Sequence, residues 1–145
     1  MSSQHTREPE QSTVTLLSLA HLMVSRQVAE GAARAGHRVK PSHSAVFGQL
    51  DGDGSRLTDL AKGANMTPQA MGELVDELET LGYVARTPDP SDRRAKLITL
   101  TGSGRQAVAA GAETIGEIER RIAKALGASG HRDLRRMLLT LLSEA

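Results

Sequence analysis

The sequence contains no cysteine and almost no aromatic residues. The absence of cysteine excludes disulfides, zinc–thiolate sites and thiol-based redox sensing. Phe47 and Tyr83 are the only aromatic residues, and so few rings argue against a protein that binds single strands by stacking their bases. We therefore expect a core of Leu, Val, Ile, Met and Ala, the residues typical of packed helices.

Long hydrophobic runs are also missing. No apolar run reaches the roughly 18 residues that a membrane span needs, and residues 1–12 are polar and lack the apolar centre of a signal peptide. The chain has no nucleophile–base pair, phosphate-binding loop or paired carboxylates in a context that suits catalysis. Together with a length of 145 residues, these absences predict a cytoplasmic protein of one domain with no membrane partner, no cofactor and no enzymatic activity.

Charge is present but unevenly distributed. The formal net charge is only +1. Acidic residues outnumber basic ones between Pro41 and Ala85. The acidic residues of this segment are Asp51, Asp53, Asp59, Glu73, Asp76, Glu77 and Glu79. The segment from Arg86 to Arg105 is basic and contains Arg86, Arg93, Arg94, Lys96 and Arg105. A nearly neutral protein thus carries a basic segment directly after an acidic one, and the basic segment suits a negatively charged partner.

Apolar periodicity predicts helices in the first half of the chain. Apolar residues recur at a spacing of three or four from Ser12, a plausible N-cap, to about Ala35. A short helix that is capped by Ser42 and includes residues 45–50 should follow. Thr58 is then expected to cap a third helix.

A tight turn and a fourth helix come next. Asn65 tolerates left-handed backbone angles, Thr67 is a good N-cap, and Pro68 occupies the favoured first helical position. One apolar face of this helix consists of Met71, Leu74, Val75, Leu78 and Leu81. Gly82 is expected to end the helix.

Two strands and two helices complete the pattern. The β-type runs 83–87 and 95–101 predict a hairpin joined by the loop 88–94. Thr101 is the predicted N-cap of a long helix that stops at Gly127, and a last helix follows after a short break. The predicted fold class is therefore mainly α with a small β-hairpin.

The third and fourth helices, joined by a short turn, form a helix–turn–helix candidate. In such a pair the first helix braces the second, and the second offers its N-terminal turn to the major groove of DNA. A hairpin immediately after it makes a winged version, whose tip can reach a phosphate or the minor groove.

In the segment Leu60 to Arg105, "LAKGANMTPQAMGELVDELETLGYVARTPDPSDRRAKLITLTGSGR", the sequence resembles the MarR (multiple-antibiotic-resistance regulator) family. The resemblance runs from about Thr13 to Leu142. It implies a homodimeric winged helix-turn-helix transcription regulator that binds a pseudo-palindromic double-stranded DNA operator. It also implies a repressor that an unknown small-molecule effector releases.

The resemblance divides the chain into regions. Residues 1–12 would form a flexible tail. Residues 13–40 and 101–145 would form the helical dimerisation region, and residues 41–100 the winged helix-turn-helix, all within one compact domain.

The same resemblance supplies candidate DNA-binding residues. The recognition helix would present Thr67, Pro68, Gln69, Gly72 and Glu73. Gln69 is the best base reader, because its amide matches the donor–acceptor edge of adenine. Glu73 and Glu77 depart from the family, in which basic or polar residues are common at these positions, and this shifts the electrostatic attraction towards the hairpin.

The hairpin would supply most of that attraction. Its candidate residues are Asp92, Arg93, Arg94 and Lys96. Arg94 would enter the minor groove, Asp92 would hold an arginine by a charge-assisted bond, and Arg93 and Lys96 would contact phosphates.

Other polar residues give weaker signals. The stretch Asp51 to Ser55 looks like the start of a calcium loop, but Arg56 and Lys62 stand where the glycine and the final carboxylate belong, so we interpret it as a turn. No histidine has ligand spacing to another ligand on one helix face, so no metal site is predicted. The resemblance also implies an effector pocket between the dimer helices and the winged region, for which the candidates are His21, Arg26, His43 and Phe47.

An alternative function stays open at this point. The acidic recognition helix would also suit a winged-helix module that binds another protein and has lost specific DNA binding. The retained basic residues of the hairpin argue against it.

Overall fold

A computed structural model describes residues 10–145. The elements are α1 (Thr13–Arg34), a 3₁₀ turn η1 (Pro41–His43), α2 (Ser44–Phe47), α3 (Leu57–Gly63), α4 (Pro68–Thr80), β1 (Val84–Asp89), β2 (Asp92–Leu100) and α5 (Gly102–Ser143). The order confirms the predicted fold class, mainly helical with one hairpin. Of the predicted flexible tail 1–12, residues 1–9 lie outside the described residues.

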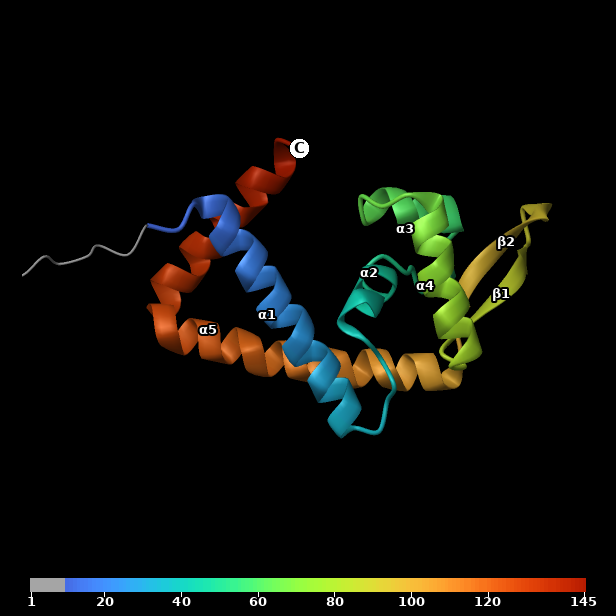
Figure 1. The fold of residues 1–145 in the computed structure, drawn as a ribbon, viewed down its shortest axis with the longest axis horizontal. Coiled ribbons are helices and arrows are strands. Elements are labelled where there is room, and N and C mark those ends of the chain that lie inside the picture. Colours follow the sequence, from blue (N-terminus) through green and yellow to red (C-terminus); the bar gives the residue numbers. More distant parts are fainter. Residues whose placement is uncertain (1–9) are drawn as a thin grey trace, which may run out of the picture.

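Helix α5 runs beneath the hairpin and α4 and is crossed by α1, whose C-terminal end lies below it in this view (Figure 1). Beyond the crossing α5 bends before it continues to the C-terminus. The bend is at Gly127, where the backbone leaves helical geometry with φ 73° and ψ 165°. The predicted stop at Gly127 is thus confirmed. No helix within residues 10–145 is long and apolar enough to cross a membrane.

A small aliphatic core holds α3, α4 and the hairpin together. Its fully buried side chains include Val46, Leu60, Met71, Val75, Leu78, Val84 and Ile98. Tyr83 closes the core at the edge nearest α1, where its hydroxyl accepts a 2.7 Å hydrogen bond from the Arg38 backbone N–H. The core fixes which face of α4 turns inward, and therefore which face remains exposed.

Most predicted helix ends are confirmed. The side chains of Ser12, Thr67 and Thr101 each cap a helix by accepting a backbone N–H from the residue three positions on. Asn65 has φ 53° and Gly82 has φ 83°, so both adopt the left-handed conformation that their turns require.

The prediction for the short second helix was wrong in detail. Ser42 does not cap it, because a 3₁₀ turn begins at Pro41 and the Ser44 hydroxyl donates to the Pro41 carbonyl at 2.7 Å. The helix ends at Phe47, and Leu50 therefore lies beyond it.

The start of α3 was also misplaced. Thr58 lies inside its first turn, and Arg56 occupies the N-cap position. The reason is tertiary: Ser55 forms a β-bridge with Ile98 of β2, with N–O distances of 3.0 and 2.8 Å. The bridge ends the extended segment at Ser55 and lets the helix begin directly after Arg56.

The hairpin is longer, and its tip shorter, than predicted. The strands reach Asp89 and begin again at Asp92, so Arg93 and Arg94 belong to β2 and not to a loop. Across the two strands Pro88 lies opposite Lys96, but the next residue, Asp89, lies opposite Asp92. This register shift leaves three residues of β2, including Arg93 and Arg94, without a residue opposite them on β1. The arginines therefore bulge from the ladder near the tip.

Candidate nucleic-acid interface

Helix α4 exposes one ridge along its length. Met71, Val75 and Leu78 are buried against the core, so residues on the opposite side, among them Gln69 and Glu73, are exposed. Thr67 and Pro68 are exposed at its start. These four candidates share the N-terminal half of one accessible helix, the part that a helix–turn–helix presents to DNA.

Gly72 lies on a different side of α4. It is half-buried, and a Cβ atom at this position would lie 3.7 Å from Leu57 Cδ2 of α3. The residue thus faces the bracing helix and not the exposed ridge.

Most acidic side chains of α4 are already paired with cations. Arg86 Nη2 lies 2.7 Å from Asp76 Oδ1, and its Nη1 lies 2.9 Å from Glu79 Oε1. Glu77 Oε2 lies 2.9 Å from both Lys40 Nζ and His43 Nε2. The His43 hydrogen bond, followed by the Lys40 hydrogen bond, lowers the pKa of Glu77. The negative charge that the sequence places on the recognition helix is therefore partly neutralised from within the protein.

Three basic side chains of β2 have no such partners in the described part of the chain, unlike Arg86 of β1. Arg93, Arg94 and Lys96 are all exposed, and no ion pair within residues 10–145 includes any of them. The hairpin projects at the edge of the molecule beside α4 (Figure 1). Three cations without partners in the described residues therefore belong to the element beside α4.

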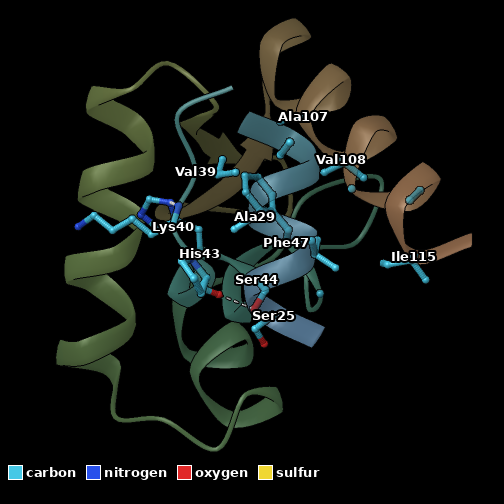
Figure 2. A pocket seen from close by; sticks show the side chains of 16 residues that line it. Ser25, Ala29, Val39, Lys40, His43, Ser44, Phe47, Ala107, Val108 and Ile115 are labelled. Carbon is cyan, nitrogen blue, oxygen red and sulfur yellow. Dashed lines mark hydrogen bonds between the residues drawn. The ribbon is translucent and has the colours of Figure 1, made fainter. Parts of the chain in front are cut away.

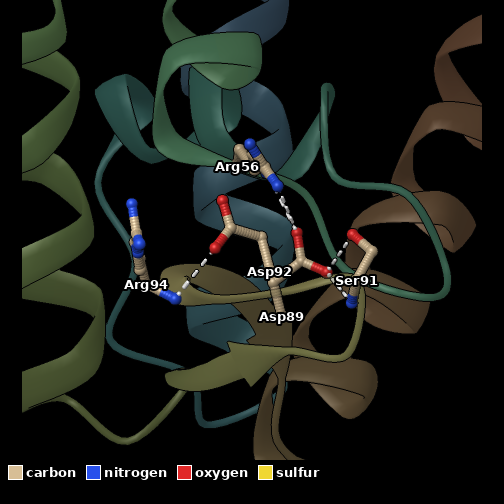
Figure 3. A network of polar contacts seen from close by, with 5 residues as sticks. All are labelled: Arg56, Asp89, Ser91, Asp92 and Arg94. Carbon is tan, nitrogen blue, oxygen red and sulfur yellow. Dashed lines mark hydrogen bonds and ion pairs between the residues drawn. The ribbon is translucent and has the colours of Figure 1, made fainter.

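The carboxylate of Asp89 holds the hairpin tip in place through hydrogen bonds to Ser91 and Arg56 (Figure 3). Asp89 Oδ1 accepts from the backbone N–H and the hydroxyl of Ser91 at 2.9 and 2.8 Å. Asp89 Oδ2 accepts from Arg56 Nε and Nη2 at 3.0 and 2.8 Å. The Ser91 bonds, and then Arg56, lower the pKa of Asp89 to about 2. Arg56 thereby ties the hairpin to the N-terminus of α3.

The sequence did not predict this cluster. The sequence assigned a charge-assisted pair with an arginine to Asp92, whereas the structure forms one between Asp89 and Arg56. Asp92 instead accepts the backbone N–H of Arg94 at 3.0 Å, and the Arg94 guanidinium extends away from Asp89 (Figure 3). The local signal was Asp89 two residues before Ser91, a spacing typical of an Asx turn.

The depressed pKa of Asp89 gives a testable pH dependence. Because ionised Asp89 binds Ser91 and Arg56, its stabilisation of the hairpin is present above the ordinary pKa and is lost as the pH falls towards 2. In an NMR titration the Ser91 amide shift should move with a midpoint near 2. A midpoint near the ordinary value of 3.8 would contradict the pairing. Asp92→Asn, the control, should leave the Ser91 midpoint unchanged.

A cavity lies between α1, the η1–α2 segment and α5 (Figure 2). Its volume is about 210 Å³, and apolar side chains such as Val28, Val39 and Ile115 form most of its wall. Of the predicted pocket residues, His43 and Phe47 line it. His21 and Arg26 are exposed on α1 and do not.

His43 connects this cavity to the recognition helix. Its side chain is buried, with 1% of its surface exposed. Its Nδ1 accepts the Lys40 backbone N–H at 3.0 Å, so the proton lies on Nε2, which donates to Glu77 Oε2 at 2.9 Å. Lys40 also lines the cavity and contacts the same oxygen. Two cavity residues therefore hold one carboxylate of α4.

The residues that the structure describes contain no cluster of histidine or acidic side chains able to hold a metal ion.

Comparison with known proteins agrees with this geometry. The sequence model of the MarR family matches residues 39–95, which contain both helices of the helix–turn–helix and most of the hairpin. The HTH-type transcriptional repressor Rv2887 of Mycobacterium tuberculosis is 34% identical over 91 residues, covering 63% of this chain and 66% of the repressor. The chain belongs to the MarR family. Its matched segment covers 66% of the length of that repressor.

Solved MarR-type structures extend the similarity over almost the whole chain. CouR from Rhodococcus jostii RHA1 bound to p-coumaroyl-CoA is 28% identical with a TM-score of 0.73, and covers 94% of this chain and 95% of that one. CouR bound to a 23-mer DNA duplex is 27% identical with a TM-score of 0.67, over 92% and 91%. The terminal helices and the winged region thus both have counterparts in CouR, which has been solved once with DNA and once with a ligand.

Proposed function

We propose that this MarR-family chain is a sequence-specific regulator that binds double-stranded DNA as a homodimer and represses transcription. The observation that carries the proposal is the exposed ridge of α4 beside a hairpin with three unpaired cations. DNA is the partner that suits this combination, because a helix can enter its major groove while neighbouring cations contact its phosphates.

Each candidate residue has a separate role in this proposal. Gln69 reads an adenine edge, and Thr67 and Pro68 position the helix start at a phosphate. Arg94 enters the minor groove, and Arg93 and Lys96 neutralise phosphates. Asp92 and Gly72 act indirectly, through the Arg94 backbone and the packing of α4 near Leu57.

The terminal helices supply the surface on which the second subunit packs. Their exposed apolar side chains include Val14, Leu16, Leu22 and Met23 of α1, and Met137, Leu139, Leu141 and Leu142 of α5. Extended apolar surface of this kind usually lies in an interface. We accordingly assign residues 13–40 and 101–145 to dimerisation and residues 41–100 to DNA binding; a two-fold dimer then matches a pseudo-palindromic operator.

The cavity is the proposed effector site. Its largely apolar wall favours a small, mostly apolar molecule. An occupant that moves His43 or Lys40 would release Glu77, shift α4 and change the separation of the two recognition helices. Such a ligand lowers DNA affinity only by as much as it prefers the shifted state.

We further propose that the regulator is cytoplasmic and has no enzymatic activity. The competing function is a winged-helix module that binds a protein and not DNA. It is favoured only by the carboxylates of α4, most of which are paired with cations.

A gel-shift experiment on the DNA upstream of the protein's own gene tests the proposal. At low salt we expect a specific complex that contains two chains and survives an excess of unrelated duplex. If the unrelated duplex competes equally well, the protein-binding function is favoured. The same complex should then be screened with small apolar molecules for loss of DNA binding.

A further inference from the structure

Glu73 differs from every other carboxylate of α4. Asp76, Glu77 and Glu79 each contact a cation at 2.7 to 2.9 Å. Glu73 takes part in no ion pair or side-chain hydrogen bond found in the described part of the chain. It is exposed, so its charge is both unneutralised and accessible.

The position of Glu73 directs it towards the groove. It lies four residues after Gln69, so the two side chains are neighbours on one ridge of α4. That ridge is opposite the buried residues Met71, Val75 and Leu78. Any duplex that α4 enters far enough to contact Gln69 must also meet Glu73.

An ionised carboxylate discriminates strongly among bases. It only accepts hydrogen bonds. In the major groove, guanine presents two acceptors and thymine presents an acceptor and a methyl group, whereas cytosine presents its N4 amino donor. Adenine has an amino donor too, but its N7 acceptor lies beside it. Cytosine is the base whose own major-groove edge offers a carboxylate a donor and no acceptor.

We propose that Glu73 is a specificity-determining residue that reads a cytosine in each operator half-site, adjacent to the base read by Gln69. The inference rests on the proposed DNA-binding function. Glu73 selects as much by excluding guanine and thymine as by binding cytosine, because an unpaired carboxylate against an acceptor edge is repelled. This role also gives a reason for an acidic side chain in a DNA-binding helix.

Selection of binding sites from a random duplex library tests this inference. Wild-type protein should enrich one half-site position for cytosine, and changing that base should weaken binding on the order of tenfold or more. Glu73→Ala should bind all four bases there with similar affinity. Glu73→Gln should shift the preference towards adenine, the partner of an amide.

The control variant is Glu79→Gln, which removes the same charge from the flank of α4 that faces Arg86. It should leave the selected sequence unchanged. If Glu73→Ala tightens binding to every duplex equally and keeps the wild-type sequence preference, Glu73 is merely repulsive and the inference is overturned. If wild-type protein enriches no sequence at all, the proposed function itself fails, which is a distinguishable result.

Discussion

Replacing Arg94 with alanine should weaken binding to a selected operator by at least about a hundredfold. Hydrogen bonds to charged groups contribute about 1.5–3 kcal/mol each, and a two-fold dimer carries two copies of the residue. The side chain is exposed and its backbone N–H is held by Asp92, so the substitution removes a contact to DNA and not a contact that supports the fold. Fluorescence anisotropy with a labelled duplex measures the loss.

The matched control is Lys124→Ala. Lys124 is an exposed cation on α5, far along the chain from the hairpin, and its replacement removes the same charge. Because Lys124 lies in the proposed dimerisation region, the variant is first shown to have the same oligomeric state as wild type, and its affinity should then stay close to that of wild type. Equal affinities for Arg94→Ala and wild type would show that Arg94 makes no contact with the operator.

Gly104→Ala should destabilise the protein by roughly 3 kcal/mol, the upper part of the range for forced overpacking. Gly104 is buried in the first turn of α5, and a Cβ there would lie 2.0 Å from the Tyr83 carbonyl oxygen. That carbonyl also accepts the Thr101 N–H at 3.1 Å, so it cannot move without breaking the junction between hairpin and helix. Urea denaturation followed by circular dichroism measures the change.

Gly116→Ala provides the contrast within the same helix. The nearest atom to a Cβ at Gly116 is the end of the flexible Arg120 side chain, at 3.5 Å. Since alanine favours helix over glycine by about 1 kcal/mol, this variant should be as stable as wild type or more so. If Gly104→Ala behaved like Gly116→Ala, the close approach of α5 to the hairpin would be wrong.

Local signals in the sequence predicted the starts of α1, α4 and α5 correctly. The caps at Ser12, Thr67 and Thr101 and the turns at Asn65 and Gly82 depend on residues only a few positions apart, and all are present. The order of helices and the hairpin followed from them. Because the family motif is also contiguous, the amino-acid sequence alone was enough to locate the candidate DNA-binding segment.

Contacts between distant residues could not be predicted in this way. Arg56 and Asp89 are 33 residues apart, and His43 and Glu77 are 34 apart. A sequence pattern does not show which distant residues lie close together in space. The sequence therefore assigned the pair with an arginine to Asp92, whereas Asp89 forms it with Arg56. The same limitation misplaced the start of α3, which depends on the bridge from Ser55 to Ile98.

The structure also changes how the acidic recognition helix should be understood. From the sequence, Glu77 looked like a charge that opposes DNA. In the fold it is held by Lys40 and by His43, a cavity residue. Within residues 10–145, Glu73 is the one carboxylate of α4 that no cation holds, and in our proposal the basic hairpin is the main source of attraction.

The salt dependence of operator binding tests this central claim most directly. The logarithm of the binding constant falls with the logarithm of salt concentration by about 0.9 for each phosphate neutralised. Replacing both Arg93 and Lys96 with alanine removes two phosphate contacts from each subunit of a dimer. The slope should therefore become shallower by roughly 3 to 4. A double variant with the wild-type slope would show that the attraction to DNA does not come from the hairpin.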